Sequence, residues 1–184
     1  MNQDSKTRVS LLRGPTDDDW RLVRQCALCT AGLELHDERH LDRRWRHAIL
    51  RARHSPIREL RFVFILEDVP YWVAMHLCRH HVGCHPYVRS QRDDRQRGEG
   101  EHDRGSARQD APVDMIWSLN AEALMTVAEK RLCNLASPET RAVVQQMCDI
   151  VDWVYQEFEG LLHAPCADCK EMHPCTSEGT SERV

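Results

Sequence analysis

The sequence lacks any long hydrophobic run. Its longest mostly apolar stretch without a charged residue covers only residues 69–78, well short of the roughly 18 to 20 residues that a membrane-spanning helix needs. The first ten residues, MNQDSKTRVS, also lack the apolar core of a secretion signal. We therefore expect no membrane partner and a cytoplasmic protein. Because that compartment is reducing, its nine cysteines are expected to be thiols or metal ligands rather than disulfides.

An excess of positive charge is also missing. The chain has 25 basic and 29 acidic residues, which gives a formal net charge of −4. Proteins that bind nucleic acid through nonspecific attraction to phosphates carry a basic surplus. We therefore expect no nucleic-acid partner, although a local basic pocket stays open.

The composition that is present is that of a soluble globular chain. Of the 184 residues, 41% are apolar and 29% are charged, a balance that favours one folded domain. We place this domain at residues 1–160, interrupted by a mobile charged loop at about residues 91–110. Residues 161–184 are expected to form a separate tail rich in cysteine and histidine.

Hydrophobic periodicity predicts more helix than strand. Strands are expected at residues 8–12 and 60–66, the latter apolar on both alternating faces. Helices are expected after the cap Thr16, at residues 37–53, at residues 69–81 with Asp68 as a cap, at about residues 116–135, and after Ser137. These elements indicate an α+β fold.

Polar residues of unusual density begin on the expected helix at residues 69–81. His76, Arg79 and His80 share one helical face because spacings of three and four residues return to the same side. Two histidines at this spacing could hold a metal, but the intervening Arg79 places a positive charge beside the ion. Guanidinium groups suit phosphate oxygens better, which favours a nucleotide ligand. A solvated basic helix end is the alternative.

Asn120 and Arg131 form a second polar pair. On a continuous helix, eleven residues return to within about 20° of the same face, with roughly 16 Å between the two positions. A face that should be apolar would then be polar at both ends, which indicates a long ligand. A snorkelling or ion-paired arginine is the alternative.

At these residues the sequence resembles the flavin-dependent thymidylate synthases. The matching segments follow the family's order over about residues 8–145: His54-Ser55-Pro56-Ile57-Arg58-Glu59, FVFIL at residues 62–66, Arg79-His80-His81, Ser90-Gln91-Arg92, Asn120-Ala121-Glu122-Ala123-Leu124, Arg131-Leu132 and ASPETR at residues 136–141. Each segment is weakly specific alone, whereas the ordered set is specific.

This resemblance implies a central antiparallel sheet flanked by helices. The implied reaction is the reductive methylation of dUMP to dTMP with methylenetetrahydrofolate, FAD and NADPH. Because reduced flavin supplies the hydride, no catalytic side chain is assigned. By position, the resemblance assigns cofactor binding to Arg79, His80, His81 and Asn120, and substrate binding to His76, Ser90, Arg92 and Arg131.

The chain also departs from the family pattern. His81 stands where the family has a second arginine, Glu122 replaces an arginine associated with flavin binding, and His76 occupies a place often held by glutamine. The helical segment before Asn120 is cut to the loop at residues 91–110, which removes an arginine that helps to hold the dUMP phosphate. The competing interpretation is a catalytically degenerate relative that binds a nucleotide or a metal.

The resemblance further implies a homo-oligomer, most often a tetramer, because the family builds each site from several subunits. A chain of 21.4 kDa is too small to enclose FAD, dUMP and folate alone. Trp45, Trp72 and Trp117 are candidate interface anchors. The commoner fate of tryptophans at helical spacing is the core of a single chain.

The tail carries a possible metal site outside the family pattern. Cys166 and Cys169 have the two-residue separation with which a tight turn presents two thiolates to one zinc ion, and His173 with Cys175 could complete four ligands. His163 is an alternative ligand. Such a closed site would be structural. Reduced thiols without a metal are the alternative.

Overall fold

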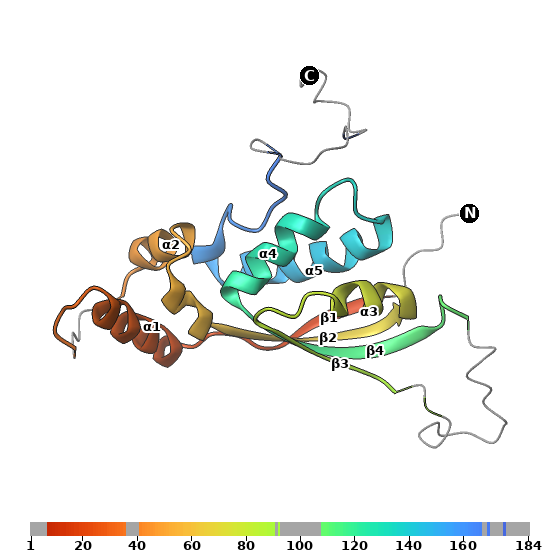
Figure 1. The fold of residues 1–184 in the computed structure, drawn as a ribbon, viewed down its shortest axis with the longest axis horizontal. Coiled ribbons are helices and arrows are strands. Elements are labelled where there is room, and N and C mark those ends of the chain that lie inside the picture. Colours follow the sequence, from red (N-terminus) through yellow and green to blue (C-terminus); the bar gives the residue numbers. More distant parts are fainter. Residues whose placement is uncertain are drawn as a thin grey trace.

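A four-stranded antiparallel sheet forms the centre of the fold (Figure 1). The computed structural model describes residues 7–35, 41–90, 92, 108–166, 169 and 175. The strands are β1 (Arg8–Arg13), β2 (Arg61–Pro70), β3 (Cys84–Val88) and β4 (Pro112–Asn120), and their order across the sheet is β1-β2-β4-β3. Neighbouring strands all pair antiparallel, so the predicted α+β class with a central antiparallel sheet is confirmed.

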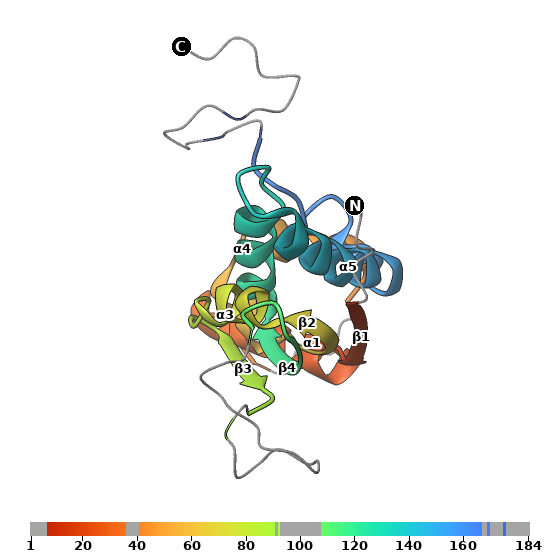
Figure 2. The ribbon, with the colours of Figure 1, turned by 90° about the vertical axis from the view of Figure 1, so that its right-hand side faces the viewer.

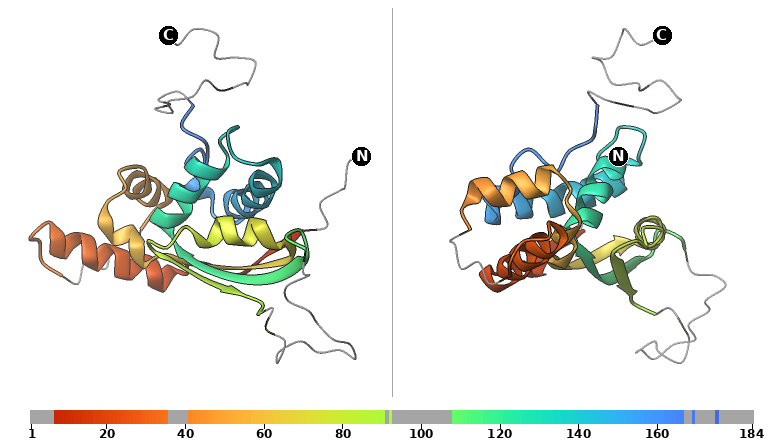
Figure 3. Two further views of the ribbon diagram at one scale, coloured as in Figure 1. Left: turned by 45° about the vertical axis from the view of Figure 1, so that its right-hand side comes forward. Right: turned by 60° about the vertical axis from the view of Figure 1, so that its left-hand side comes forward.

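Helices α3 (Tyr71–Cys78), α4 (Ala121–Arg131) and α5 (Pro138–Val154) lie together over one face of this sheet (Figures 1 and 2). Helices α1 (Asp17–Thr30) and α2 (Arg43–Arg51) lie at one end of it, with the short 3-10 helices η1 (Ser55–Glu59) and η3 (Gln156–Phe158) between them and the sheet. Two further views give the same arrangement and show that the sheet is curved (Figure 3).

The core lies between the sheet and the three covering helices and continues to α1, α2 and η1. Alternate residues of the two central strands are buried against the helices, among them Phe62, Phe64, Met115, Trp117 and Leu119. Successive side chains of a strand point to opposite faces, so the residues between them lie on the other face. No described helix covers that face, where Ile116 is 41% exposed.

Side-chain caps set the beginnings of the predicted helices. Thr16 and Asp19 form a reciprocal capping box at α1, in which the Thr16 N–H donates to Asp19 Oδ2 at 2.8 Å and the Asp19 N–H donates to Thr16 Oγ1 at 3.4 Å. Ser137 caps α5, whose first residue is Pro138, and its Oγ accepts from the Thr140 N–H at 3.4 Å. Both predicted caps are confirmed.

The predicted cap at Asp68 is wrong. Strand β2 continues through Pro70, and Asp68 lies within it with φ 54°, at a register shift between Leu66 and Val69. The Asp68 N–H donates to Asp114 Oδ1 at 3.4 Å, and the carbonyl of Asp68 accepts from Thr7 Oγ1 at 3.1 Å. These bonds hold Asp68 in a bulge of the sheet, so α3 begins only at Tyr71.

The predicted helix at residues 116–135 is also wrong in its first part. Residues 112–120 are strand β4, and Asn120 is the cap of α4 rather than a residue of its face. The strand passes directly into the helix, so the alternation of buried residues in β4 runs into the helical spacing of α4 without a turn between them. Asn120 and Arg131 therefore do not share one helical face.

Two smaller features also differ from the sequence-based expectation, the start of one helix and one edge strand. Helix α2 begins at Arg43, after the cap Asp42 accepts a hydrogen bond from the Trp45 N–H at 2.8 Å. Residues 36–40, which include the start predicted for this helix, lie outside the described residues. Strand β3 was not predicted, because only one of its five residues, Cys84, is buried.

No helix among the described residues is long and apolar enough to span a membrane.

Candidate functional site

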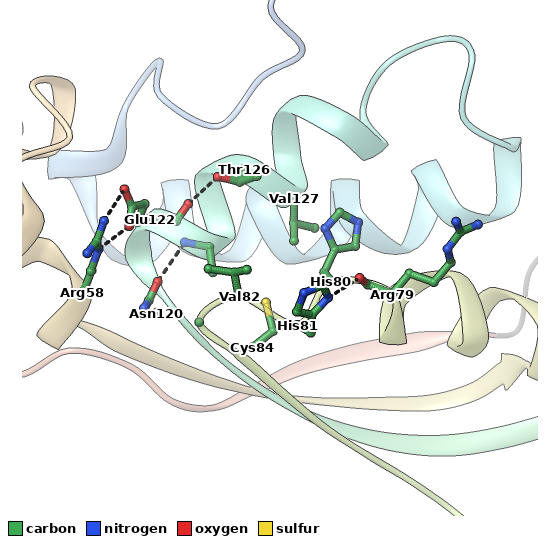
Figure 4. Close-up of a pocket in the computed structure, with 12 residues that line it drawn as sticks. Arg58, Arg79, His80, His81, Val82, Cys84, Asn120, Glu122, Thr126 and Val127 are labelled. Carbon is green, nitrogen blue, oxygen red and sulfur yellow. Dashed lines mark hydrogen bonds and ion pairs between the residues drawn. The ribbon is translucent and has the colours of Figure 1, made fainter.

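A cavity of about 580 Å³ opens between the chain that follows α3, strand β3 and the first half of α4. Its lining residues with charged, imidazole or amide side chains come from separate parts of the sequence: Arg58, Arg79, His80, His81, Asn120 and Glu122. Figure 4 shows these side chains around the opening, with Cys84, Thr126 and Val127 beside them. Volumes of about 300–1,000 Å³ are typical of small-molecule sites.

The tight turn after α3 positions the first group of lining residues. Arg79 caps the end of the helix, and the His80 N–H donates to the Leu77 carbonyl at 3.0 Å. Gly83 then takes φ 70°, a conformation that side chains rarely adopt, and a Cβ there would lie 2.6 Å from Asn120 Nδ2. The glycine therefore allows the turn to approach Asn120 closely, and the Gly83 carbonyl accepts from the Asn120 N–H at 3.0 Å.

Asn120 joins this turn to helix α4. Its backbone closes the contact with Gly83, while its side-chain Oδ1 accepts from the Ala123 N–H at 2.8 Å and caps the helix. Asn120 is only 8% exposed. One residue thus fixes the first turn of α4 against the Arg79-His80-His81 segment.

His80 is held in one protonation state by Arg131. The Arg131 Nε–H donates to His80 Nε2 at 2.8 Å, and Nη2 of the same guanidinium donates to the His76 carbonyl at 3.3 Å. A nitrogen that accepts a hydrogen bond carries no proton, so the ring proton of His80 is on Nδ1. Burial, the charge of Arg131 and, less strongly, His81 lower the pKa of His80 to about 4. His80 is therefore neutral at pH 7.

The guanidinium of Arg131 is itself partly removed from solvent. Burial and the nearby charge of Arg79 lower its pKa below the ordinary arginine value, although the group stays charged at pH 7. Arg131 contacts the cavity only through His80 and is not among the residues that line it. It acts on the site by orienting an imidazole.

Charge at the cavity mouth is mixed. Arg58, from η1, forms an ion pair with Glu122, in the first turn of α4. Bonding to Glu122 raises the pKa of Arg58. Arg79 and His81 are exposed, and His81 Nδ1 lies 3.1 Å from the Arg79 carbonyl. Among the described lining residues, Glu122 is the one acidic side chain.

Cys84 lies on the inner wall as a protonated thiol. It is 4% exposed, and burial raises its pKa to about 11, against a smaller opposing effect from Arg61. The thiolate is the nucleophilic form of cysteine. This cysteine is therefore not activated for nucleophilic attack near pH 7.

The residues predicted from the sequence divide into two groups in the structure. The four assigned to the cofactor, Arg79, His80, His81 and Asn120, line the one cavity together. The four assigned to the substrate, His76, Ser90, Arg92 and Arg131, do not line it. The His76 ring packs edge-on against Trp72, with centroids 5.3 Å apart. Ser90 and Arg92 lie after β3, where the Arg92 N–H donates to Ser90 Oγ at 3.3 Å.

Neither candidate metal site gains support from the structure. Nε2 of His80 already accepts a hydrogen bond from Arg131, which opposes a metal clamp with His76. In the tail, Cys166 and Cys169 are exposed and Cys175 is partly buried, whereas His173 lies outside the described residues. The described part of the chain holds no group of three or more potential metal ligands.

Sequence reasoning missed Thr126 and Val127 as lining residues. Ala123 lies three residues after Asn120, and Thr126 and Val127 lie three and four residues after Ala123. This spacing of one helical face, counted from Asn120, could have identified them. Arg58 has no such signal, because only the folded chain brings η1 beside the start of α4.

Comparisons with known proteins concern a segment of the sequence and the fold. Residues 98–155 match the family model described as thymidylate synthase complementing protein. Among solved structures, the UMP/dUMP methylase PolB from Streptomyces cacaoi bound with 5-Br dUMP has a TM-score of 0.65 and 17% identity, covering 87% of this chain and 97% of that chain. No curated protein matches the chain in sequence.

Thymidylate synthase X from Helicobacter pylori with FAD and dUMP has a TM-score of 0.61 and 14% identity, over 85% of this chain and 97% of that chain. A second structure of the H. pylori flavin-dependent synthase, also complexed with FAD and dUMP, gives 0.64 and 15%, over 84% and 97%. The resemblance to the flavin-dependent thymidylate synthase family is confirmed. At these identities the structures establish a shared fold, and the chain spans nearly the whole of each solved relative.

Proposed function

We propose that this chain is a flavin-dependent thymidylate synthase, which reductively methylates dUMP to dTMP with methylenetetrahydrofolate, FAD and NADPH. One observation carries the proposal. In a fold shared with this family, the four residues assigned to the cofactor converge on one cavity from the turn after α3 and the start of α4. The positions of Arg79 and Asn120 in the sequence do not by themselves require the two residues to lie at the same cavity.

The lining suits a dinucleotide such as FAD. Guanidinium groups bind phosphate oxygens through paired, charge-assisted hydrogen bonds, and Arg79 offers one at the exposed side of the cavity. His80 contributes a neutral ring whose free proton is on Nδ1. Asn120 adds a side-chain amide to the lining. Bound FAD would supply the redox chemistry that these side chains cannot perform.

The side chains of this site position ligands and set the local charge. Because Arg131 fixes the tautomer of His80, that ring can donate from Nδ1 without reorganising. Cys84 stays protonated, which agrees with a reaction that uses no cysteine nucleophile. We assign Arg131 a positioning role through His80. Ser90 and Arg92 remain the proposed contacts for dUMP, outside the cavity.

We further propose a cytoplasmic homotetramer. The cavity is open to solvent, and one face of the sheet has no covering helix among the described residues. Both features are expected of a protomer that completes its site with neighbouring copies. Trp117 is fully buried within a single chain and is therefore excluded as an interface anchor, whereas Trp45 and Trp72 are only partly buried. Light scattering should give about four times 21.4 kDa.

A catalytically degenerate nucleotide-binding relative is the second candidate. It is favoured by Glu122, which occupies the position of a flavin-associated arginine in the family pattern and pairs with Arg58 in this chain. The pair reduces the net positive charge available to an anionic cofactor. Nucleotide binding without turnover would be the expected result.

A reconstituted assay separates the two candidates. The purified protein is supplied with FAD, NADPH and methylenetetrahydrofolate, and with either dUMP or UMP, since a solved relative is described as a methylase of both. Chromatography then measures the methylated nucleotide. We expect dTMP from the wild type and at least a tenfold lower rate from Arg79→Ala. Flavin and dUMP binding without product would favour the degenerate relative, and absence of both would refute the proposal.

A further inference from the structure

An ion pair joins two of the residues that line the cavity. Arg58 extends from η1 and Glu122 from the first turn of α4, and both line the cavity (Figure 4). The guanidinium uses two nitrogens: Nε bonds to Oε2, and Nη2 lies 3.4 Å from Oε1. This fork-shaped contact is the geometry with which arginine also binds a phosphate group.

The pair differs in character from the rest of the lining. Arg79 forms no ion pair with another described residue, and Glu122 is the one acidic residue that lines the cavity in the described part of the chain. The Arg58 side chain is 57% exposed and Glu122 is 30% exposed. Solvent therefore reaches the arginine, so an incoming anion can approach it without unfolding any element.

We propose that Arg58 is a phosphate-binding residue of this cavity and that Glu122 is its resting counterion, which a ligand phosphate must displace. This inference rests on the proposed function only in that the cavity receives a nucleotide. The phosphate belongs either to a dinucleotide pyrophosphate or to a nucleotide monophosphate, and the test below separates the two.

The exchange has a defined electrostatic consequence. While Glu122 holds Arg58, the approaching phosphate meets an ion pair with no net charge. When the phosphate takes over the fork of Arg58, Glu122 is left as a negative charge beside the ligand. Glu122 therefore weakens anion binding in two ways, by competing for Arg58 and by repelling the ligand. Replacing it by a neutral isostere should strengthen binding more when Arg58 is present, because without Arg58 only the repulsion is removed.

The test is a double-mutant cycle on Arg58→Ala and Glu122→Gln, with inorganic pyrophosphate as the probe in isothermal titration calorimetry. We expect Glu122→Gln to tighten binding about three- to tenfold and Arg58→Ala to weaken it by about the same factor. In the Arg58→Ala background, the change in log Kd caused by Glu122→Gln should be less than half of the change that it causes in the wild type. Repeating the titration with dUMP identifies which phosphate Arg58 receives.

Glu67→Gln is the matched control. It breaks an exposed pair with Arg8 on β1 and β2 that does not line the cavity, so it should leave pyrophosphate binding unchanged. Arg58→Lys keeps the charge without the fork and provides a second variant if Arg58→Ala does not fold, as judged by circular dichroism. It should bind less tightly than the wild type.

Equal effects of Glu122→Gln with and without Arg58 would overturn the inference, as would absence of pyrophosphate and dUMP binding in both the wild type and Glu122→Gln. A separate measurement, FAD binding followed by flavin fluorescence, tests the proposed function. If FAD binds but Arg58 and Glu122 show no coupling in the double-mutant cycle, only the role of Arg58 is refuted. If the two residues are coupled but FAD does not bind, only the synthase assignment is refuted.

Discussion

His80 should make the native state lose stability as the pH falls. In the folded chain its pKa is lowered from 6.5 to about 4, first by burial and then by the charge of Arg131. Between these two values the unfolded chain binds a proton at His80 and the native chain does not. Because stability rises with pH wherever the unfolded state binds more protons, His80 should reduce the free energy of unfolding progressively from pH 6.5 down to pH 4.

The expected magnitude follows from the interval between the two pKa values. At 1.36 kcal/mol per unit, the full interval corresponds to about 3 kcal/mol. Since the ring is only about half buried, screening by solvent reduces this to about 1–2 kcal/mol. The perturbation is His80→Gln, which removes the titrating ring but retains an acceptor for Arg131. Urea unfolding followed by tryptophan fluorescence at half-unit pH steps gives the stability of both proteins.

The difference between wild type and His80→Gln should therefore change by about 1–2 kcal/mol between pH 6.5 and 4. Asp152 acts in the opposite direction, because burial and, less strongly, Asp149 and Glu159 raise its pKa to about 6, so the native state binds its proton first. Measuring both proteins in an Asp152→Asn background removes this contribution. Identical pH profiles with and without His80, or an NMR titration of its ring near pH 6.5, would refute the reasoning.

Three further predictions concern other parts of the molecule. Asn120→Ala should cost about 1 kcal/mol of unfolding free energy through loss of the α4 cap, whereas Asn120→Asp should retain most of it; equal losses in urea unfolding would contradict the capping role. Cys84 should resist iodoacetamide at pH 8 in the native protein while the exposed Cys29 reacts, as read by mass spectrometry, and Cys84→Ser should stay active. Elemental analysis of the wild type and of Cys166→Ser/Cys169→Ser tests the zinc site suggested by the spacing of the tail cysteines; less than about a tenth of an equivalent of zinc in the wild type would count against that site and favour metal-free thiols.

The helices with caps could be predicted from the sequence because their signals are local. Thr16 and Ser137 each precede a run of helical spacing, and the first bond of each helix involves residues within one turn. The apolar strand β2 was equally clear in its centre. Its extension through Asp68 to Pro70 was not, because that extension depends on pairing with β4, which is distant in sequence.

The other misassigned segments also depend on long-range pairing. Strand β3 contains Pro86 and buries only Cys84, so it shows no strand pattern and exists because it forms the edge beside β4. In residues 112–120, buried Met115, Trp117 and Leu119 alternate, but the helical spacing of α4 follows at once and obscured the alternation. The period of two was present and was not recognised.

The candidate site was predictable where a motif carried it. The Arg79-His80-His81 segment and Asn120 were identified from the order of short motifs, and the structure brings them together at one cavity. The partners of these residues were not predictable. Neither the Arg131–His80 hydrogen bond nor the Arg58–Glu122 pair has a signal in the spacing, because each joins residues more than fifty positions apart.

Complementation of thymidine auxotrophy tests the central claim most directly. The gene is expressed in a bacterium that lacks its own thymidylate synthase, and growth is scored without thymidine. Wild type and the surface control Glu67→Gln should both support growth, whereas Arg79→Ala, expressed at the same soluble level, should not. Failure of the soluble wild-type protein to support growth, or equal growth with Arg79→Ala, would contradict the assignment of this cavity to thymidylate synthesis.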